Sequence, residues 1–156
     1  MHIHLNVPWS SPMTDFLLDP AHCVSGNLHK TARAVSRLYA DAMRPAGLAR
    51  SQFAVLGHLE RLGPVPVSEL ADRLYMERTT LTRNLSPLVD GGLVDRQPSP
   101  QDARVKLVAI TDAGRAKLEE ARGYWREAQA RMLDSIGEDA WRKLEDQLRQ
   151  LRRMVR

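Results

Sequence analysis

The sequence predicts a mainly α-helical protein that carries one small β-hairpin. Two observations support this prediction. Apolar residues recur every three or four positions through most of the chain, which is the period of amphipathic helices. Residues 93–110 break this period, because two short runs rich in β-forming residues flank a polar loop, the pattern of a hairpin.

Length and composition set the broad class. With 156 residues the chain has the size of one domain, and its 43% hydrophobic and 27% charged residues are typical of a soluble globular protein. The net charge of +4 is consistent with an anionic partner. No apolar run approaches the roughly 18–20 residues that cross a membrane, and the start lacks the pattern of a signal peptide. We therefore expect a cytoplasmic protein with no membrane partner.

The N-terminal part predicts an arm and a long helix. Residues 1–18 show no sustained period, so we expect a flexible arm. Asp19 and Pro20 are typical of a helix start, with the acid as N-cap and the proline at the first helical position. This helix is expected to continue to residue 47. Its apolar face consists of Val24, Leu28, Ala32, Val35, Tyr39 and Met43.

Three shorter helices follow. The apolar period predicts them over residues 52–62, 67–74 and 78–89, and Gly91-Gly92 stops the last one. The residues that we expect to face inward are Phe53, Leu56, Leu59, Leu70, Ala71, Leu74, Leu81, Leu85 and Leu88.

Two long helices complete the chain. Thr111 is the expected N-cap of a helix that Gly137 breaks. The last helix carries apolar residues at steps of three, four, three and four, which is the spacing of a coiled-coil seam. This seam consists of Trp141, Leu144, Leu148, Leu151 and Val155.

Residues 67–89 have the pattern of a helix-turn-helix: a short helix, a tight turn and a helix rich in Arg and Thr. In this motif the second helix enters the major groove of DNA, where Arg bridges guanine, Asn pairs with adenine and Thr contacts phosphate or a thymine methyl group. The candidate DNA-binding residues of this helix are Arg78, Thr79, Thr80, Thr82, Arg83 and Asn84. Of these, we expect the following to point directly outward: Thr79, Thr80, Arg83 and Asn84.

A hairpin directly after such a helix is the wing of a winged helix-turn-helix. We expect its strands at Leu93–Arg96 and Val105–Ile110, with the tip beside the minor groove, where an inserted Arg gains from the negative potential. Arg104 is the side chain expected to reach DNA. Asp102 braces either the loop or the Arg104 guanidinium, and Lys106 is a further candidate contact.

Three stretches resemble the MarR family of bacterial transcription regulators: LADRLYMERTTLTRNLSPLVDGGLVDR, the D-A-R of the wing, and LVAITDAGR. The resemblance covers roughly residues 25–150. It implies a winged helix-turn-helix over residues 48–111 and a homodimer joined through helices at 19–47 and 112–156. It also implies a pseudo-palindromic operator on double-stranded DNA, repression in most members, and release by a small aromatic or lipophilic ligand or by an oxidant. The Asp-x-Arg pair of the family falls on Asp102 and Arg104.

Three positions depart from the family pattern. Glu77 occupies the position where Ser, Thr or Asp usually caps the recognition helix. Pro87 lies inside that helix, where it frees the carbonyl of Arg83 and should bend the helix. Ala103 stands where a further Arg is common, which makes the wing less basic.

Five apolar residues are the predicted dimer contacts, because the first and last helices have no other partner long enough to cover them. They are Leu28, Trp141, Leu144, Leu148 and Leu151. The alternative is that the seam packs within one chain. An apolar effector pocket is expected between the first, second and fifth helices. Its proposed polar handles are Tyr39, His58 and Trp125, each of which is equally well explained as core or interface packing.

Cys23 is the single cysteine, so no disulfide can form within the chain. We expect it in the opening turn of the first helix, where the helix dipole favours a reactive thiolate. The resemblance adds that some MarR members sense peroxides or reactive sulfur through one cysteine in this region. The alternative is a small buried apolar residue. No cluster with zinc spacing accompanies the histidines, so we expect no metal and no other cofactor. The histidines considered are His2, His4, His22 and His29.

These observations predict a DNA-binding transcription regulator, most simply a homodimeric repressor that a small-molecule effector releases. Two alternatives stay open: a repressor that senses oxidants or reactive sulfur through Cys23, and a winged-helix module that binds another protein. We expect no enzyme, because the sequence shows no Ser/His/Asp set, no phosphate-cradling glycine loop and no paired catalytic carboxylates.

Overall fold

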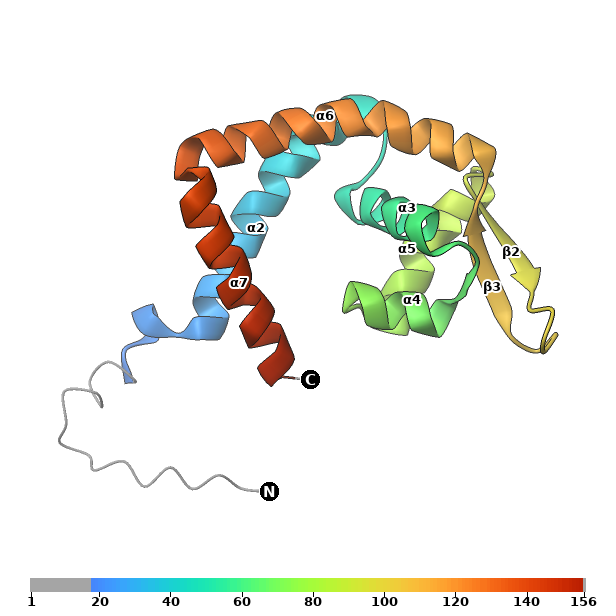
Figure 1. Ribbon diagram of the computed structural model, residues 1–156, viewed down its shortest axis with the longest axis horizontal. Helices are drawn as coiled ribbons and strands as arrows, with labels where there is room; N and C mark the ends of the chain where they lie inside the picture. The colour runs from blue at the N-terminus through green and yellow to red at the C-terminus, as the bar shows by residue number, and fades with distance from the viewer. Residues whose placement is uncertain (1–17, 156) are drawn as a thin grey trace, which may run out of the picture. The chain divides into compact units, whose positions relative to one another are not determined.

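The computed structural model describes residues 18–155 and confirms a mainly helical fold with a small sheet (Figure 1). Its α-helices are α2 (Val24–Met43), α3 (Arg50–Leu62), α4 (Val67–Leu74), α5 (Arg78–Asp90), α6 (Asp112–Ile136) and α7 (Glu138–Met154). Its strands are β1 (Val65–Pro66), β2 (Val94–Pro98) and β3 (Lys106–Ile110), and its short 3-10 helices are η1 (Pro20–His22) and η2 (Arg44–Ala46). The predicted arm, apart from Leu18, lies outside the described residues, as do His2 and His4. No helix in the described range is long and apolar enough to cross a membrane.

The predicted first helix is interrupted near its start. Asp19 caps the 3-10 helix η1, and its Oδ1 accepts a hydrogen bond from the Ala21 N–H at 2.8 Å. Cys23 then has extended backbone, with φ −61° and ψ 115°, so α2 begins only at Val24. The prediction of one continuous helix from residue 19 was therefore wrong. An acid followed by proline can also start a 3-10 turn, and such turns often precede α-helices.

The hydrophobic core lies in the second of two compact units, into which the chain divides after Leu38. In the first unit, none of the described residues 18–38 is buried. In the second, the core joins α3, α4, α5, the sheet and part of α6. Phe53 and Leu74, which we predicted to face inward, are half-buried at its edge. The largest fully buried side chains are Met43, Val55, Leu56, Leu59, Leu70, Leu81, Leu85, Leu88, Val94, Val108 and Leu118.

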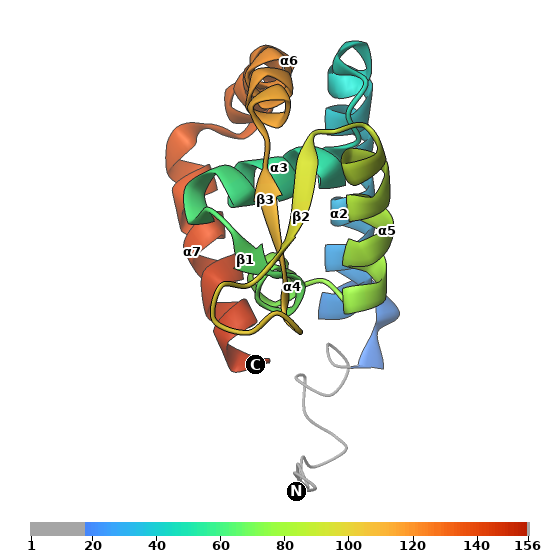
Figure 2. The same ribbon diagram turned by 90° about the vertical axis from the view of Figure 1, so that its right-hand side faces the viewer.

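The sheet has three antiparallel strands in the order β1-β3-β2 (Figure 2). Strands β2 and β3 form the predicted hairpin, with Val94 opposite Ile110; with the loop between them they are called the wing below. Strand β1 is an addition that we did not predict, and its Val65 lies opposite Val108. With two residues, one of them proline, β1 is too short to show the alternating period of a strand. It ties the wing to the segment between α3 and α4.

A tight joint connects the wing to α6. Thr111 caps α6 as predicted, since its Oγ1 accepts a hydrogen bond from the Gly114 N–H at 3.0 Å. The same hydroxyl donates to the Gly92 carbonyl at 2.7 Å, and the Thr111 N–H donates to the Leu93 carbonyl at 3.1 Å. Gly114 is buried in this joint. A Cβ atom at position 114 would lie 2.1 Å from the Leu93 carbonyl oxygen and 2.8 Å from Ile110 Cγ1, so only glycine fits.

The turn between α4 and α5 holds a strained residue. Tyr75 has φ 52° and ψ 42°, and it is the one non-glycine residue in the described range with positive φ. This conformation ends α4, because the N–H groups of Tyr75 and Met76 donate back to the carbonyls of Asp72 and Ala71, at 3.3 and 2.9 Å. Glycine usually takes this position without strain. The Tyr75 side chain is 57% exposed, so burial contributes little toward offsetting the strain.

We expect Gly114→Ala to lower the free energy of unfolding by about 1–3 kcal/mol, because the new methyl group collides with backbone that cannot move without breaking the joint. Gly123→Ala is the matched control. Gly123 lies in the same helix with nothing within 4 Å of an added Cβ, so alanine there should stabilise by about 0.5–1 kcal/mol through helix propensity. Urea unfolding followed by circular dichroism measures both. Equal effects of the two substitutions would contradict the close contact at Gly114.

We expect Tyr75→Gly to raise the free energy of unfolding by about 0.5–1 kcal/mol. The left-handed conformation costs residues other than glycine about 1–2 kcal/mol. The greater conformational freedom of glycine in the unfolded chain reduces the resulting gain in stability by about 0.5–1 kcal/mol. Tyr75→Ala removes the same side chain but keeps the strain, so it should be less stable than the glycine variant in thermal unfolding. The opposite order would show that the backbone at Tyr75 is not strained.

Candidate DNA-binding surface

Helix α5, called the recognition helix below, is fixed to the core along one side. Leu81, Leu85 and Leu88 are at most 1% exposed, so the side opposite these leucines faces solvent. The exposed candidate residues are Arg78, Thr79, Thr80, Thr82 and Arg83. The predicted inward and outward sides are thus observed at these positions, whereas their contacts with DNA stay predictions.

Two of the family departures can be located on this helix. Glu77 precedes the first turn but makes no side-chain capping hydrogen bond. Pro87 lies inside the helix, which continues to Asp90. Ser86, its neighbour, uses its hydroxyl to donate to the Thr82 carbonyl at 3.1 Å. The helix therefore keeps its length despite an uncapped start and an internal proline.

The threonines of the recognition helix differ in whether their hydroxyl groups already donate a hydrogen bond within the protein. The Thr82 hydroxyl donates to the Arg78 carbonyl at 2.8 Å, so its proton is already used. Thr79 and Thr80 are exposed, and their hydroxyls form no hydrogen bond with other described residues. These two hydroxyls are free to donate to a phosphate oxygen.

Asn84 does not point outward as predicted. It is half-buried, and its Oδ1 accepts a hydrogen bond from the Ser51 hydroxyl of α3 at 2.7 Å. Its Nδ2 donates to the Thr80 carbonyl at 3.0 Å. The expectation of an outward side chain was wrong because position 84 lies three residues after Leu81 and four before Leu88, at the edge of the buried stripe.

The cations of this region have no acidic partners in the described part of the chain. In the recognition helix and the wing, five basic side chains are exposed and none forms an ion pair within residues 18–155. They are Arg78, Arg83, Arg96, Arg104 and Lys106. Arg96, on β2, is a candidate contact that our sequence analysis missed, although a base in the first wing strand was a signal for it. Unpaired surface cations keep their charge available for phosphate.

The wing tip is ordered by Asp102 through its backbone contacts. The Asp102 Oδ1 accepts a hydrogen bond from the Arg104 N–H at 2.9 Å, and the Asp102 carbonyl accepts one from the Val105 N–H at 2.9 Å. The Ser99 N–H closes the loop by donating to the Val105 carbonyl at 2.8 Å. No ion pair joins Asp102 to Arg104 in the part of the chain that the structure describes. Of the two roles left open for Asp102, bracing the loop is the one observed.

The three predicted effector residues lie on different helices, and each has a partner. The Tyr39 hydroxyl on α2 donates to Gln129 of α6 at 2.5 Å, and burial raises its pKa, an effect that the charge of Arg50 partly offsets. The His58 Nδ1 lies 2.9 Å from the Ala54 carbonyl. Trp125 of α6 stacks on Phe53 of α3, with ring centroids 6.0 Å apart. All three are half-buried, and their role in effector binding stays a prediction.

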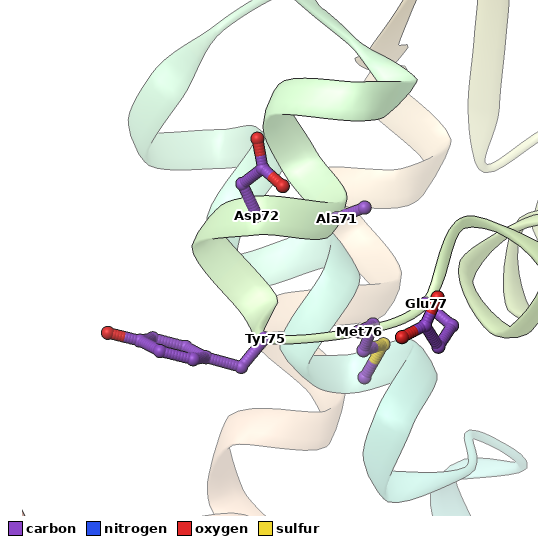
Figure 3. A pocket seen from close by; sticks show the side chains of 5 residues that line it. All are labelled: Ala71, Asp72, Tyr75, Met76 and Glu77. Carbon is purple, nitrogen blue, oxygen red and sulfur yellow. The ribbon is translucent and has the colours of Figure 1, made fainter. Parts of the chain in front are cut away.

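A hollow of about 510 Å³ lies elsewhere, at the end of α4 and the turn that follows (Figure 3). Its lining residues are Ala71, Asp72, Tyr75, Met76 and Glu77. Tyr75 extends away from the other four side chains in this view, and the two carboxylates make the hollow acidic. None of the predicted effector residues lines it, so it is not the predicted pocket.

Cys23 is exposed and lies immediately before α2 rather than within its opening turn. Its Sγ accepts a hydrogen bond from the Gly26 N–H at 3.3 Å, which is the geometry of a helix N-cap. The alternative of a small buried residue was therefore wrong. Neighbouring His22 lies 3.6 Å from Asp19. No group of three metal-ligating side chains gathers within residues 18–155.

The predicted dimer contacts stand out as uncovered apolar surface. Leu28, Leu144 and Leu151 are 42%, 41% and 37% exposed, whereas Trp141 and Leu148 are half-buried. Helix α7 has no buried residue at all. The dimer contacts and the alternative that the seam packs within one chain both stay predictions.

Comparison with known proteins gives the chain its family. A family model described as MarR family matches residues 46–105. The HTH-type transcriptional regulator YwoH of Bacillus subtilis (strain 168) is 33% identical over 93 residues, which cover 60% of this chain and 67% of YwoH. Several curated relatives match over about two thirds of their own length.

Solved structures extend the similarity to most of the chain. The transcriptional regulator MosR of M. tuberculosis, in complex with DNA, has a TM-score of 0.74 and 36% identity, covering 86% of this chain and 98% of that one. A mutant of MarR from E. coli, complexed with operator DNA, has a TM-score of 0.76 and 26% identity, covering 82% and 92%. With the winged helix-turn-helix described above, these matches show that the chain belongs to the MarR family of DNA-binding transcription regulators.

Proposed function

We propose that this MarR family member binds a pseudo-palindromic operator as a homodimer, represses transcription there, and is released by a small aromatic or lipophilic effector. One observation carries the proposal: the recognition helix is anchored by buried leucines and exposes Arg78 and Arg83, which have no acidic partner among residues 18–155. That arrangement suits insertion into the major groove. The similar MarR and MosR chains in DNA complexes support it, and the similar MdtR of Bacillus subtilis is named a transcriptional repressor.

Dimerisation is proposed from the apolar seam of α7. Leu144, Leu148 and Leu151 follow one another at steps of four and three, and Leu144 and Leu151 are 41% and 37% exposed in the single chain. A second copy is the simplest cover for such a stripe, since closed two-fold dimers dominate among soluble oligomers. Two-fold symmetry would also set the recognition helices about 34 Å apart, one turn of DNA.

Effector release is proposed to act at the contacts between α6 and the helices α2 and α3. Tyr39, His58 and Trp125 would supply the aromatic walls and polar handles of the site. A ligand that separated the Trp125 and Phe53 rings would change how α3 packs on α6. Because α3 also supports the recognition helix, such a change would alter DNA binding.

The central test is a binding titration on the DNA upstream of the chain's own gene. Arg83→Ala should lose about 1–3 kcal/mol, roughly 5- to 150-fold in affinity, and relax the preference at one base pair if Arg83 bridges a guanine. Arg142→Ala, on α7 and paired with Glu138, is the control and should bind as wild type. Affinity should also fall steeply with salt, because phosphate contacts release counterions. A wild-type chain without salt-dependent DNA binding would favour the alternative of a protein-interaction module.

The dimer is tested by sedimentation equilibrium at micromolar concentration. The wild type should sediment as a dimer, and Leu148→Glu should sediment as a monomer with much weaker operator binding, since a charge in the seam cannot be buried and both half-sites must engage together. Gln150→Glu adds the same charge at an exposed position of α7 and should leave the dimer intact. A monomeric wild type would refute this part of the proposal.

A redox switch at Cys23 is the second candidate, because the thiol is exposed and caps α2. Peroxide would transfer one oxygen atom to the thiolate, giving a sulfenate and water, and the added bulk would disturb the start of α2. In an operator-release assay, peroxide should then free the wild type and leave Cys23→Ser bound. If the two respond alike, release depends on a small-molecule effector instead.

A further inference from the structure

We propose that Ser51 and Asn84 form a brace that sets the rotation of the recognition helix against α3, and that Asn84 is a positioning residue which reads no base. This inference rests on the proposed function, because it assumes that α5 enters the major groove. It assigns a role to Ser51, which no sequence motif indicates.

The brace joins the first turn of α3 to the middle of the recognition helix. Ser51 is the second residue of α3, and its hydroxyl donates to the Asn84 Oδ1 at 2.7 Å, across 33 positions of sequence. The Asn84 Nδ2 donates in turn to the Thr80 carbonyl at 3.0 Å. Both ends of the amide are therefore engaged within the protein, and both Ser51 and Asn84 are half-buried.

The leucine stripe alone does not define this rotation. Leu81, Leu85 and Leu88 hold the helix against the core, but apolar contacts are not directional. A hydrogen bond has a preferred length and angle, so one placed at the edge of the stripe limits how far the helix can turn. With side chains, a helix has a radius of about 5–6 Å, and a turn of about 20° moves the exposed side chains by about 2 Å. That displacement exceeds the tolerance of about 0.5 Å for a binding constellation.

Asn84 is adjacent to Arg83 and four residues after Thr80, so the brace acts directly on the exposed residues of the helix. Oδ1 and Nδ2 each keep one further hydrogen-bonding site, but if the half-buried side chain turned outward to read a base, it would leave both Ser51 and Thr80. Breaking hydrogen bonds in this way is unfavourable. The contacts of Asn84 therefore favour positioning over base reading, although Asn is the residue type that pairs with adenine.

The test uses the full-length protein and a duplex that the wild type selects from a random pool, with each base pair then varied in turn. The variants are Ser51→Ala, Asn84→Ala and the double substitution. Ser135→Ala is the control, because the Ser135 hydroxyl donates within its own helix, α6, to the Arg131 carbonyl. Ser51→Thr keeps the hydroxyl and should restore binding.

We expect Ser51→Ala and Asn84→Ala each to weaken binding about 3- to 10-fold, and the double substitution to be no weaker than either, because they break one shared interaction. The salt dependence should stay unchanged, since no phosphate contact is lost. Both variants should relax preference at the same base pairs as Arg83→Ala, a result that a loss of stability alone would not produce.

Three outcomes would overturn the inference. If Asn84→Ala relaxes a base pair that Ser51→Ala leaves intact, Asn84 reads that base. If Ser51→Ala binds like Ser135→Ala, the brace has no effect, and the proposed function survives. If the wild type selects no sequence, the proposed function fails and the inference fails with it.

Discussion

The contact between Gly114 and the Leu93 carbonyl is the constraint on which the arrangement of this protein depends. It brings the end of the recognition helix, the start of the wing and the first turn of α6 to one point, where the Thr111 hydroxyl bonds to Gly92 and Gly114. Because no side chain separates these backbones, α6 cannot change its angle without moving the wing. A movement at the far end of α6 is therefore transmitted to the wing and to the end of the recognition helix.

The basic residue that joins α3 to α6 is paired with acids, unlike the bases of the recognition helix and wing within residues 18–155. On α6, Arg122 bonds to Glu60 of α3 and to Glu119, and hydrogen bonding to Glu119 raises its pKa. Its ion pairs are partly shielded from solvent and help to hold α3 on α6, next to the stack of Phe53 on Trp125. The bases of the recognition helix and wing have no such partners among the described residues. A cation that already has a carboxylate partner must give it up before it can neutralise a phosphate, so the unpaired cations are the ones suited to bind DNA.

What the sequence predicted well depends on local rules. The spacing of Leu81, Leu85 and Leu88 was sufficient to place α5 and its buried side, and Thr111 was recognised as a cap from its residue type and position. The errors arose where a local rule allowed two conformations, or where a residue distant in the sequence determined the direction of a side chain. Asp19-Pro20 started a 3-10 helix, and β1 was too short to show a period. Asn84 accepts a hydrogen bond from Ser51, 33 positions earlier in the chain, and this bond keeps its side chain from pointing outward. Periodicity carries no information on such long-range pairs.

Asp102 illustrates how this protein resolves a conflict at its wing. A carboxylate near the phosphate backbone is repelled by it, so charge alone argues against an acid at this position. Its Oδ1 and carbonyl instead hold the N–H groups of Arg104 and Val105, which fixes the backbone from which the Arg104 side chain extends. Within residues 18–155 the Asp102 carboxylate accepts from a backbone N–H and forms no ion pair with the Arg104 guanidinium, so no carboxylate has to be displaced from Arg104 before it meets an anion. The acid thus orders the loop that carries the cation without pairing with it, and a loop that is ordered in advance would lose less entropy on binding a partner.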